Sequence, residues 1–358
     1  MLPALDSAIA TIRQAAALQQ PLRLRGGGSK AFATPPSTAP VLDTRALAGI
    51  VAYEPTELVV TAWAGTPLSE LETLLAGRGQ CLPFEPPHFG PGATLGGLVA
   101  AGVSGPARAS VGSVRDYVLG TQLVNGRGEL LSFGGQVMKN VAGYDVSRLM
   151  AGSWGTLGLI AQVSLKVLPV APAEATLRFA LPQARALDQL QRWGGQPLPL
   201  NASRWQDDTL WLRLRGAVAA VESACTRLLA EVPGERLDNT AAATDWTACR
   251  DQQLPFFTAP AAHLGLWRLS VAPHAPMLEV PGPQLIEWHG GQRWVWAPAT
   301  AGTALISAAA QAGGHATLWR LPADGSGQGM PRHTPQPTAL AQIESRLKAE
   351  FDPNGIFI

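Results

Sequence analysis

The chain has 358 residues, of which 46% are hydrophobic and 15% are charged, and its formal net charge is +1. This composition is typical of a globular protein and excludes a disordered one, and the near-neutral charge without long Lys or Arg runs excludes a nucleic-acid partner. A chain of this length is expected to form two domains, each large enough to bury its own core.

Cysteine content and hydropathy indicate the compartment. Cys81, Cys225 and Cys249 are far apart, so they predict neither a disulfide framework nor a Cys-x-x-Cys metal or iron–sulfur site. No apolar run approaches the roughly 20 residues that span a bilayer. The first 20 residues predict an amphipathic helix interrupted by charges, which is not the pattern of a signal peptide. We therefore expect a cytoplasmic protein.

Short strands and helices alternate in the first half. Residues 22–25 and 58–63 predict strands. The second strand precedes a helix with Thr66 as N-cap and Pro67 at the first helical position. The apolar face of this helix consists of three leucines: Leu68, Leu71 and Leu75.

A hairpin and a further strand complete the first half. Residues 118–124 and 129–133 predict two strands joined by Asn-Gly-Arg-Gly, a turn sequence typical of hairpins. Residues 162–167 alternate like another strand. This mixture of hairpins and helices predicts an α+β fold and not a doubly wound parallel sheet. Two prolines within residues 168–172 predict a domain boundary.

The second half has a less regular pattern and holds nine of the eleven tryptophans. Residues 210–214 and 293–296 predict strands, and residues 218–229 predict a helix. A mobile loop is expected at residues 321–338, which are rich in Gly and Pro. A final helix is expected at residues 339–350, with an apolar face made of Leu340, Ile343 and Leu347.

Glycine-rich segments of the first half could hold a ligand. Glycine costs backbone entropy and adds no side chain, so such runs are typical of a backbone that bends sharply or lies against a flat ligand. Gly26-Gly27-Gly28-Ser29 follows a strand, and its amides could hold a phosphate. The dinucleotide fingerprint does not fit because nearby prolines prevent the helix it must open, and a Walker loop does not fit because Lys30 follows Ser29. A plain turn is the alternative.

Three other segments share this character, at residues 86–97, 101–105 and 152–160. In the last of them glycines recur every third residue and run directly into the strand at 162–167. Its hydroxyl and free amides suit the polar edge of a ring or a phosphate, and an ordinary glycine-rich turn is the alternative.

Taken in order, these segments resemble the FAD-binding domain of the vanillyl-alcohol oxidase superfamily, the type shared with p-cresol methylhydroxylase. The resemblance covers about residues 1–170. Within the superfamily, the sequences at 25–30, 139–145 and 351–357 are similar to those of the FAD-binding subunits of bacterial glycolate oxidases. Such subunits work beside a second flavin subunit and an iron–sulfur subunit.

The resemblance implies a domain organisation. Residues 1–170 would form a two-lobed α+β FAD-binding domain of the p-cresol methylhydroxylase type. Residues 171–338 would form a smaller α+β cap domain for substrate or partner. Residues 339–358 would form a C-terminal helix and tail. The protein would be cytoplasmic and would reach the inner membrane only through partner subunits.

The resemblance also implies which residues bind FAD. The first loop would hold the pyrophosphate, the second and third segments would line the pyrophosphate and ribityl chain, and the fourth would make main-chain contacts with flavin or adenine. We expect noncovalent FAD, because relatives that tether flavin use a His or Cys near these loops, and this chain has neither at a matching position. The expected cofactor-binding residues are Arg25, Gly26, Gly27, Gly28, Ser29, Lys30, Pro87, His88, Phe89, Gly90, Pro91, Gly92, Ala93, Thr94, Gly96, Gly97, Ala101, Gly102, Val103, Ser104, Asp116, Trp154, Gly155, Thr156, Leu157, Gly158, Leu159 and Ile160.

The activity implied by the resemblance is the oxidation of a small 2-hydroxy acid, glycolate, to glyoxylate. This reaction needs a cation for the carboxylate, a base for the hydroxyl proton and a flavin to take the hydride. Lys139, Tyr144 and His315 are the candidate catalytic residues. A solvated loop lysine and a surface or core histidine are the alternatives for Lys139 and His315. No His-x-His or His/Glu spacing predicts a metal site.

The role of this chain within a complex stays open between three hypotheses. Because the cap is short and lacks the ligands of lactate-oxidising relatives, we expect an accessory or electron-relaying flavin subunit. The first alternative is a self-sufficient FAD-dependent oxidase or dehydrogenase of another 2-hydroxy acid or alcohol. The second alternative is a non-catalytic structural subunit, against which the glycine-rich segments speak.

Overall fold

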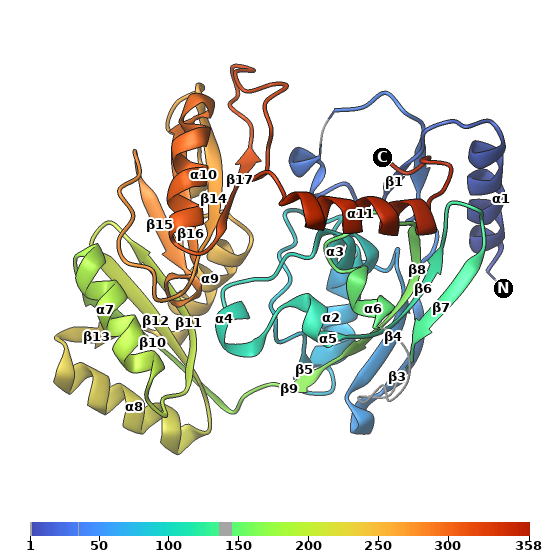
Figure 1. Ribbon diagram of the computed structural model, residues 1–358. Helices are drawn as coiled ribbons and strands as arrows, with labels where there is room; N and C mark the ends of the chain where they lie inside the picture. Colours follow the sequence, from blue (N-terminus) through green and yellow to red (C-terminus); the bar gives the residue numbers. More distant parts are fainter. Residues whose placement is uncertain (1, 35, 136–144) are drawn as a thin grey trace. The chain divides into compact units, whose positions relative to one another are not determined.

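The computed structural model describes residues 2–34, 36–135 and 145–358, and it divides into two compact units (Figure 1). The first unit comprises Met1–Ser104, Gly112–Val170 and Gln336–Ile358. The second comprises Gly105–Val111 and Ala171–Pro335. Neither unit is continuous in sequence. A short segment of the range 1–170 packs with the second unit, and the C-terminal segment packs with the first.

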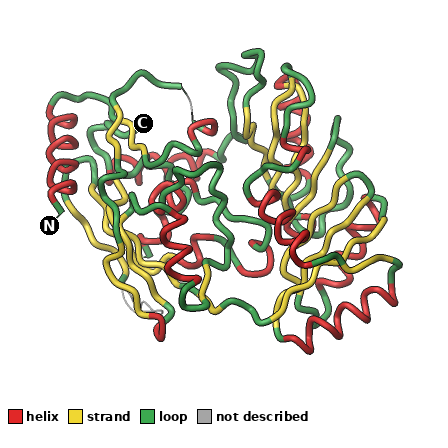
Figure 2. The backbone as a smooth tube through the Cα atoms, turned by 180° about the vertical axis from the view of Figure 1, so that it is seen from behind, coloured by secondary structure: helices red, strands yellow, loops and turns green. Residues whose placement is uncertain are grey.

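A five-stranded antiparallel sheet, in the order β3-β4-β8-β6-β7, forms the centre of the first unit (Figure 2). The predicted hairpin is confirmed in β6 and β7, where Asn125 Oδ1 accepts hydrogen bonds from the amides of Arg127 and Glu129. The strands are β3 (Ile50–Glu54), β4 (Val59–Trp63), β6 (Val118–Val124), β7 (Leu130–Gly134) and β8 (Leu159–Lys166).

Two small sheets and six α-helices complete the described part of the first unit. Strand β1 (Arg23–Arg25) pairs in parallel with β2 (Val41–Asp43), and β5 (Gln80–Cys81) pairs with β9 (Leu168–Pro169). The helices are α1 (Pro3–Ala17), α2 (Leu68–Ala76), α3 (Leu95–Ala101), α5 (Val114–Tyr117), α6 (Val146–Leu149) and α11 (Thr338–Phe351), with 3₁₀ turns at Ala31–Ala33 and Pro55–Glu57.

Helix α2 confirms the predicted helix but not its cap. Its three leucines are fully buried, and Gly77 ends it. The prediction of Thr66 as N-cap is wrong, because Pro67 occupies that position. The Thr66 hydroxyl instead accepts from the amide of Gly49 at 3.0 Å and donates to its carbonyl at 3.2 Å, so a tertiary contact uses the group that a cap would need.

The N-terminal helix and the C-terminal tail share one core. Leu5, Ile12 and other buried residues of α1 pack in a cluster that also contains Leu22, Ile356 and Phe357. The backbone of Leu22 pairs in parallel with that of Phe357. The last residues of the chain thus lie beside the residue that leads into β1.

The second unit contains an eight-stranded antiparallel sheet in the order β13-β10-β12-β11-β15-β16-β14-β17. The strands are β10 (Ala173–Ala180), β11 (Leu200–Gln206), β12 (Thr209–Gly216), β13 (Gly234–Arg236), β14 (Leu264–Ser270), β15 (Gln284–Glu287), β16 (Gln292–Pro298) and β17 (His315–Arg320). The helices are α4 (Arg108–Val111), α7 (Gln183–Gly194), α8 (Val218–Glu231), α9 (Asn239–Arg250) and α10 (Gly302–Gln311), with 3₁₀ turns at Pro255–Phe257, Trp288–Gly290 and Ala299–Ala301.

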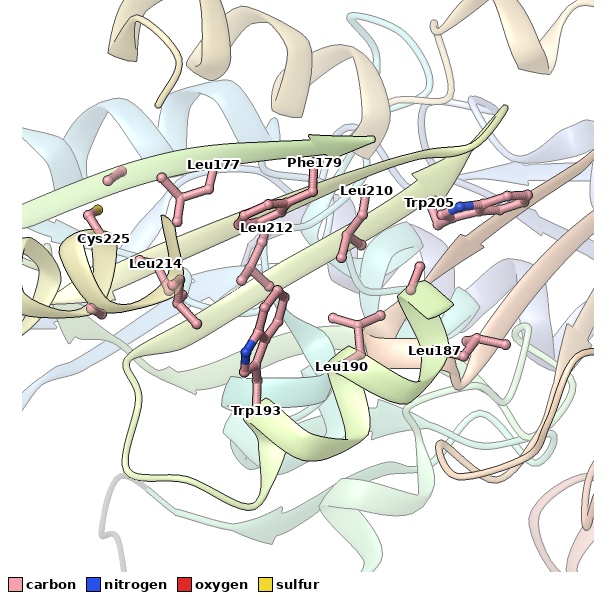
Figure 3. Close-up of a cluster of buried hydrophobic side chains, with 14 of the residues drawn as sticks. Leu177, Phe179, Leu187, Leu190, Trp193, Trp205, Leu210, Leu212, Leu214 and Cys225 are labelled. Atoms are coloured by element: carbon pink, nitrogen blue, oxygen red, sulfur yellow. The ribbon is translucent and has the colours of Figure 1, made fainter. Parts of the chain in front are cut away.

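Alternating leucines of β12 build a core of this unit (Figure 3). Leu210, Leu212 and Leu214 are fully buried on one face, as the period of two of a strand requires. The side chains of Leu190 and Trp193 from α7 pack against them. Each fully buried leucine contributes about 1.5–3 kcal/mol to folding. The predicted strands at residues 210–214 and 293–296 are confirmed as β12 and β16, and the predicted helix at residues 218–229 is confirmed as α8.

The predicted α+β class is also confirmed, because both main sheets are antiparallel and are accompanied by helices. The last predicted helix exists as α11, but its apolar face is not buried: Leu340 is 43% exposed and Ile343 is 53% exposed. The residues between β17 and α11 contain turns and one isolated bridge, from Thr317 to His333.

Candidate functional site

The first glycine-rich loop lies directly against the second. A Cβ added to Gly27 would lie 1.4 Å from the carbonyl oxygen of Gly92, and a Cβ on Gly26 would lie 2.3 Å from Thr94 Oγ1. Real Cβ atoms essentially never come within 3.0 Å of such atoms. Glycine at positions 26 and 27 therefore allows these two backbones to approach.

Consecutive amides of the first loop have no partner in the described part of the chain. The N–H groups of Gly26, Gly27, Gly28 and Ser29 form no hydrogen bond there, and Gly28 adopts a left-handed φ of +71°. Unpaired backbone N–H groups are rare in folded proteins unless water or a ligand satisfies them. Successive N–H groups in a turn form a concave site that suits an anion such as a phosphate.

Side chains of the same two loops also meet. Lys30 is 8% exposed, and its Nζ lies 5.5 Å from the ring centroid of Phe89 and 3.4 Å from Ser29 Oγ. Phe89 packs edge-on against Phe32 at 5.6 Å. Lys30 thus places a positive charge beside the loop with the free amides.

The third segment meets the fourth. Gly102 ends α3 with a φ of +66°, and a Cβ on it would lie 2.8 Å from the Cα of Gly152. The amides of Gly152 and Trp154 donate to the carbonyls of Val99 and Ala100 at 3.1 and 2.8 Å. The glycine-rich turn is therefore docked on the last turn of α3, whose N-cap is Thr94.

The turn at residues 152–158 returns to the first strand. Trp154 has a φ of 52°, and a Cβ added to Gly155 would contact Leu24 of β1 at 3.5 Å. The amides of Gly155, Leu157 and Gly158 form no hydrogen bond with described residues. The tertiary structure thus links all four segments within the first unit and leaves two sets of amides available to a ligand.

Several predicted site residues have other contacts. Ser104 Oγ accepts from the amide of Val114, and the Asp116 carboxylate accepts from the amide and hydroxyl of Ser113 as part of a helix cap. His88 Nε2 lies 2.9 Å from a carboxylate oxygen of Glu72. These side chains thus have local contacts within the chain, and their predicted role in cofactor binding stays a prediction.

The remaining predicted residues of the site are placed by the fold as follows. Leu159 and Ile160 are buried in β8 and pair with Val124 and Leu123. Arg25 ends β1, and Pro87, Gly90, Pro91, Ala93, Gly96, Gly97, Ala101, Val103 and Thr156 lie on the segments described above or in α3.

The catalytic candidates from the sequence are not brought together. Lys139 and Tyr144 lie outside the described residues. His315 begins β17 in the second unit and is exposed. Although the residue is exposed, the surrounding protein partly desolvates the imidazole, and this, with the positive charge of Arg268 and nearby His333, lowers the pKa of His315.

The second unit holds a cationic cluster that sequence reasoning missed. The guanidinium of Arg108 lies 4.4 Å from the ring centroid of Trp288, and that of Arg268 lies 5.3 Å from it. Arg268 Nε donates to Gln292 Oε1 at 2.8 Å, and its terminal nitrogens form no hydrogen bond or ion pair with described residues. Burial, together with the charge of Arg108, lowers the pKa of Arg268 to about 10. The side chain stays cationic at neutral pH and can bind an anion.

His289 lies next to this cluster in a strained turn. Trp288 and His289 have φ angles of 54° and 55°, and the indole N–H of Trp288 donates to the carbonyl of Gly105 at 3.0 Å. His289 Nε2 lies 3.0 Å from Ser110 Oγ, while its buried Nδ1 has no hydrogen-bond partner among the described residues. Burial lowers the pKa of His289 to about 4, so the imidazole is neutral at pH 7.

The sequence gives weak signals for these residues. Arg268 lies in a strand of otherwise apolar neighbours, and His289 precedes two glycines, Gly290 and Gly291. Neither pattern by itself indicates a partner on residues 105–111, which are far away in the sequence. In the described ranges no group of three or more His, Cys, Asp or Glu residues could hold a metal ion. None of the helices there is long and apolar enough to cross a bilayer.

Comparison with known proteins gives the same family as the motifs. Residues 5–134 match the family described as the FAD binding domain. The chain is 44% identical over 346 residues to the glycolate oxidase subunit GlcE of Escherichia coli (strain K12), covering 97% of this chain and 93% of that protein. It is 30% identical over 128 residues to the glycolate oxidase subunit GlcD of Bacillus subtilis (strain 168), covering 36% of this chain and 27% of that protein.

A solved structure supports the fold. An alkyldihydroxyacetonephosphate synthase superposes with a TM-score of 0.69 at 16% identity, covering 98% of this chain and 74% of that one. This similarity concerns the fold alone. Together with the family match, it confirms the expected fold class and the expectation that the first half carries an FAD-binding domain.

Proposed function

The chain belongs to the family of the glycolate oxidase subunit GlcE, and from this premise we propose that it is the FAD-binding subunit of a glycolate-oxidising complex. The observation that carries the proposal is the structure of the Gly26–Ser29 loop. This loop contacts Gly92 and Thr94, and its consecutive amides form no hydrogen bond with described residues. The enzyme class is an FAD-dependent oxidoreductase acting on CH–OH groups.

The residues of the first unit fit a noncovalent FAD. The four amides of the first loop bind the pyrophosphate, and Lys30 adds positive charge beside it. The free amides of Gly155, Leu157 and Gly158 bind the polar edge of flavin or adenine. When bound, the flavin accepts a hydride from the substrate carbon. The predicted side-chain role of Asp116 is not part of this proposal, because its carboxylate already caps α5.

Glycolate oxidation places further demands on the protein. The carbon loses a hydride, the hydroxyl loses a proton, and the carboxylate needs a cation. Arg268 is the candidate cation, because its terminal nitrogens form no hydrogen bond or ion pair with described residues.

The proposed complex contains partners. We infer a second flavin subunit, related to the GlcD protein, and an iron–sulfur subunit that receives the electrons. Any attachment to the inner membrane would go through those subunits, from a cytoplasmic position.

A flavin assay tests the proposal. The purified chain should be yellow, or should become yellow when apoprotein is mixed with FAD, and acid precipitation should release all flavin into the supernatant. Flavin in the pellet would mean covalent attachment. A colourless chain that FAD does not reconstitute would overturn the proposal and favour the structural-subunit alternative.

The self-sufficient enzyme is the second candidate, and the cluster at Arg268 favours it because a pure electron relay does not need a carboxylate-binding cation. Anaerobic glycolate added to the isolated chain should then bleach the flavin. Bleaching only in the presence of partners would identify a relay subunit. A panel of other 2-hydroxy acids tests the substrate class.

A further inference from the structure

A lysine of the C-terminal helix joins three separate segments of the first unit. Lys348 Nζ lies 2.7 Å from the carbonyl oxygen of Thr156, 2.8 Å from that of Phe357 and 2.5 Å from Asp352 Oδ2. An ammonium group has three N–H donors, so these contacts use all of them. One of the acceptors belongs to the glycine-rich turn at residues 152–158.

The acidic partner of Lys348 is fixed on its other side. The Asp352 side chain is fully buried and accepts from the amides of Ile356 and Phe357 at 3.1 and 2.9 Å. A Cβ on Gly126 would lie 2.3 Å from Asp352 Oδ1, so the β6–β7 turn packs directly on this carboxylate. Gly126 also donates its amide to the carbonyl of Phe351 at 2.8 Å.

The third acceptor connects this lysine to the first loop. The backbone of Phe357 bridges to Leu22, whose amide donates to the carbonyl of Ile356 at 2.6 Å. Leu22 precedes β1, and β1 leads directly into the Gly26–Ser29 amides. Lys348 therefore contacts the turn at residues 152–158 directly and is connected to the Gly26–Ser29 loop through Phe357, Leu22 and β1.

We propose that Lys348 is a positioning residue that holds the Thr156 turn and the entry to β1 in the spacing that FAD binding requires. It touches neither cofactor nor substrate in this proposal. It acts because the Thr156 carbonyl cannot tilt away without giving up a charge-assisted hydrogen bond, and this fixes the orientation of the adjoining amides of Gly155 and Leu157. The proposal rests on the proposed FAD site and adds a residue about 190 positions away in sequence.

The test uses four variants of the full chain. K348M removes all three donors, and K348R retains a cation with several donors. K348M/D352N also removes the buried carboxylate charge and with it the destabilisation that an unpaired buried charge causes, although the Asn side chain can accept from only one of the Ile356 and Phe357 amides. K166M is the matched control, because the ammonium group of Lys166 in β8 forms no hydrogen bond or ion pair with described residues.

Two measurements distinguish this proposal from the proposed function. Amide hydrogen exchange of the apoprotein reports the two segments without any cofactor through their hydrogen-bonded amides, which are those of Leu22, Arg23, Gly152 and Trp154. In K348M and the double variant, exchange at these amides should rise at least tenfold, with β12 of the second unit unchanged. In FAD titrations, K348M and the double variant should bind FAD at least tenfold more weakly than the wild type. K348R should recover part of this affinity, and K166M should bind FAD as the wild type does.

Each outcome decides a separate point. Unchanged exchange at 152–158 in the double variant would overturn the positioning role, whatever FAD does. Faster exchange with an unchanged FAD affinity would also overturn it, because the turn would then not need this spacing. If the wild-type chain binds no FAD while exchange responds as expected, the proposed function fails and Lys348 is a structural residue only.

Discussion

The substitution Gly27→Ala tests the geometry of the proposed FAD site most directly. Its Cβ would lie 1.4 Å from the carbonyl oxygen of Gly92, so the two loops must separate by about 2 Å to reach an ordinary contact. A displacement of that size removes two or more charge-assisted hydrogen bonds from a pyrophosphate. At about 1.5–3 kcal/mol each, FAD affinity should fall at least about a hundredfold.

Two further alanine variants grade this prediction. A Cβ on Gly92 would lie 3.3 Å from the Gly27 carbonyl oxygen, which a small shift relieves, so Gly92→Ala should weaken FAD binding much less. Gly194, at the end of α7 in the second unit, has nothing within 4 Å of the added Cβ and should leave FAD binding unchanged.

The assay is FAD titration of each apoprotein by flavin fluorescence, with circular dichroism and thermal unfolding of the same samples. A Gly27→Ala apoprotein that is folded but does not bind FAD supports the reasoning. Wild-type affinity in Gly27→Ala, or an equal loss in Gly92→Ala, would refute it, because the close contact would then not set the position of the amides.

Three other predictions concern the second unit. Arg268→Met should raise the KM for glycolate at least about tenfold, because it removes a charged hydrogen-bond donor. Arg268→Lys should recover part of the loss. Steady-state kinetics of the complex check this prediction, and an unchanged KM in Arg268→Met would refute it. Glu287→Leu should lower the free energy of unfolding by at least about 2 kcal/mol in urea titrations, because the buried Trp294 and Gln292 donors both lose their acceptor, Glu287 Oε2, at about 1–3 kcal/mol each. The pKa of His289 falls from 6.5 to about 4 on folding, so its imidazole takes up a proton at a higher pH in the unfolded chain than in the folded chain. The free energy of unfolding should therefore drop by up to about 3 kcal/mol as the pH falls from 6.5 to 4. Urea titrations at pH 7 and 5 should show a smaller drop in His289→Asn, which tolerates the left-handed φ, and an equal drop in both proteins would contradict the assignment.

Local patterns in the sequence were sufficient for the class of the fold and for part of the secondary structure, including β4, β6, β7, β12, β16, α2 and α8. The alternation of Leu210, Leu212 and Leu214 predicts a strand because side chains of a strand point alternately to its two faces, and these residues are buried on one face. The Asn-Gly-Arg-Gly turn predicts a hairpin because its residues tolerate the left-handed backbone that such a turn needs. Glycine density alone also indicated where a ligand could approach the backbone.

Local pattern could not give partners that are far apart in the sequence. Thr66 has the residue type of a helix cap, but a contact with Gly49 uses its hydroxyl. Leu340 and Ile343 have the spacing of a buried face, but whether such a face is covered depends on what packs against it. The sequence likewise gave no reason to connect Arg108 with Trp288.

The local sequence was therefore enough to predict several strands and helices, the glycine-rich loops and the family to which their order belongs. Which of these segments contact one another followed only from the tertiary structure. The approach of Gly27 to Gly92 and the bond from Lys348 to the Thr156 carbonyl join positions far apart in the chain. Periodicity and turn chemistry act over a few residues, whereas these contacts depend on sheet register and close packing of the whole unit.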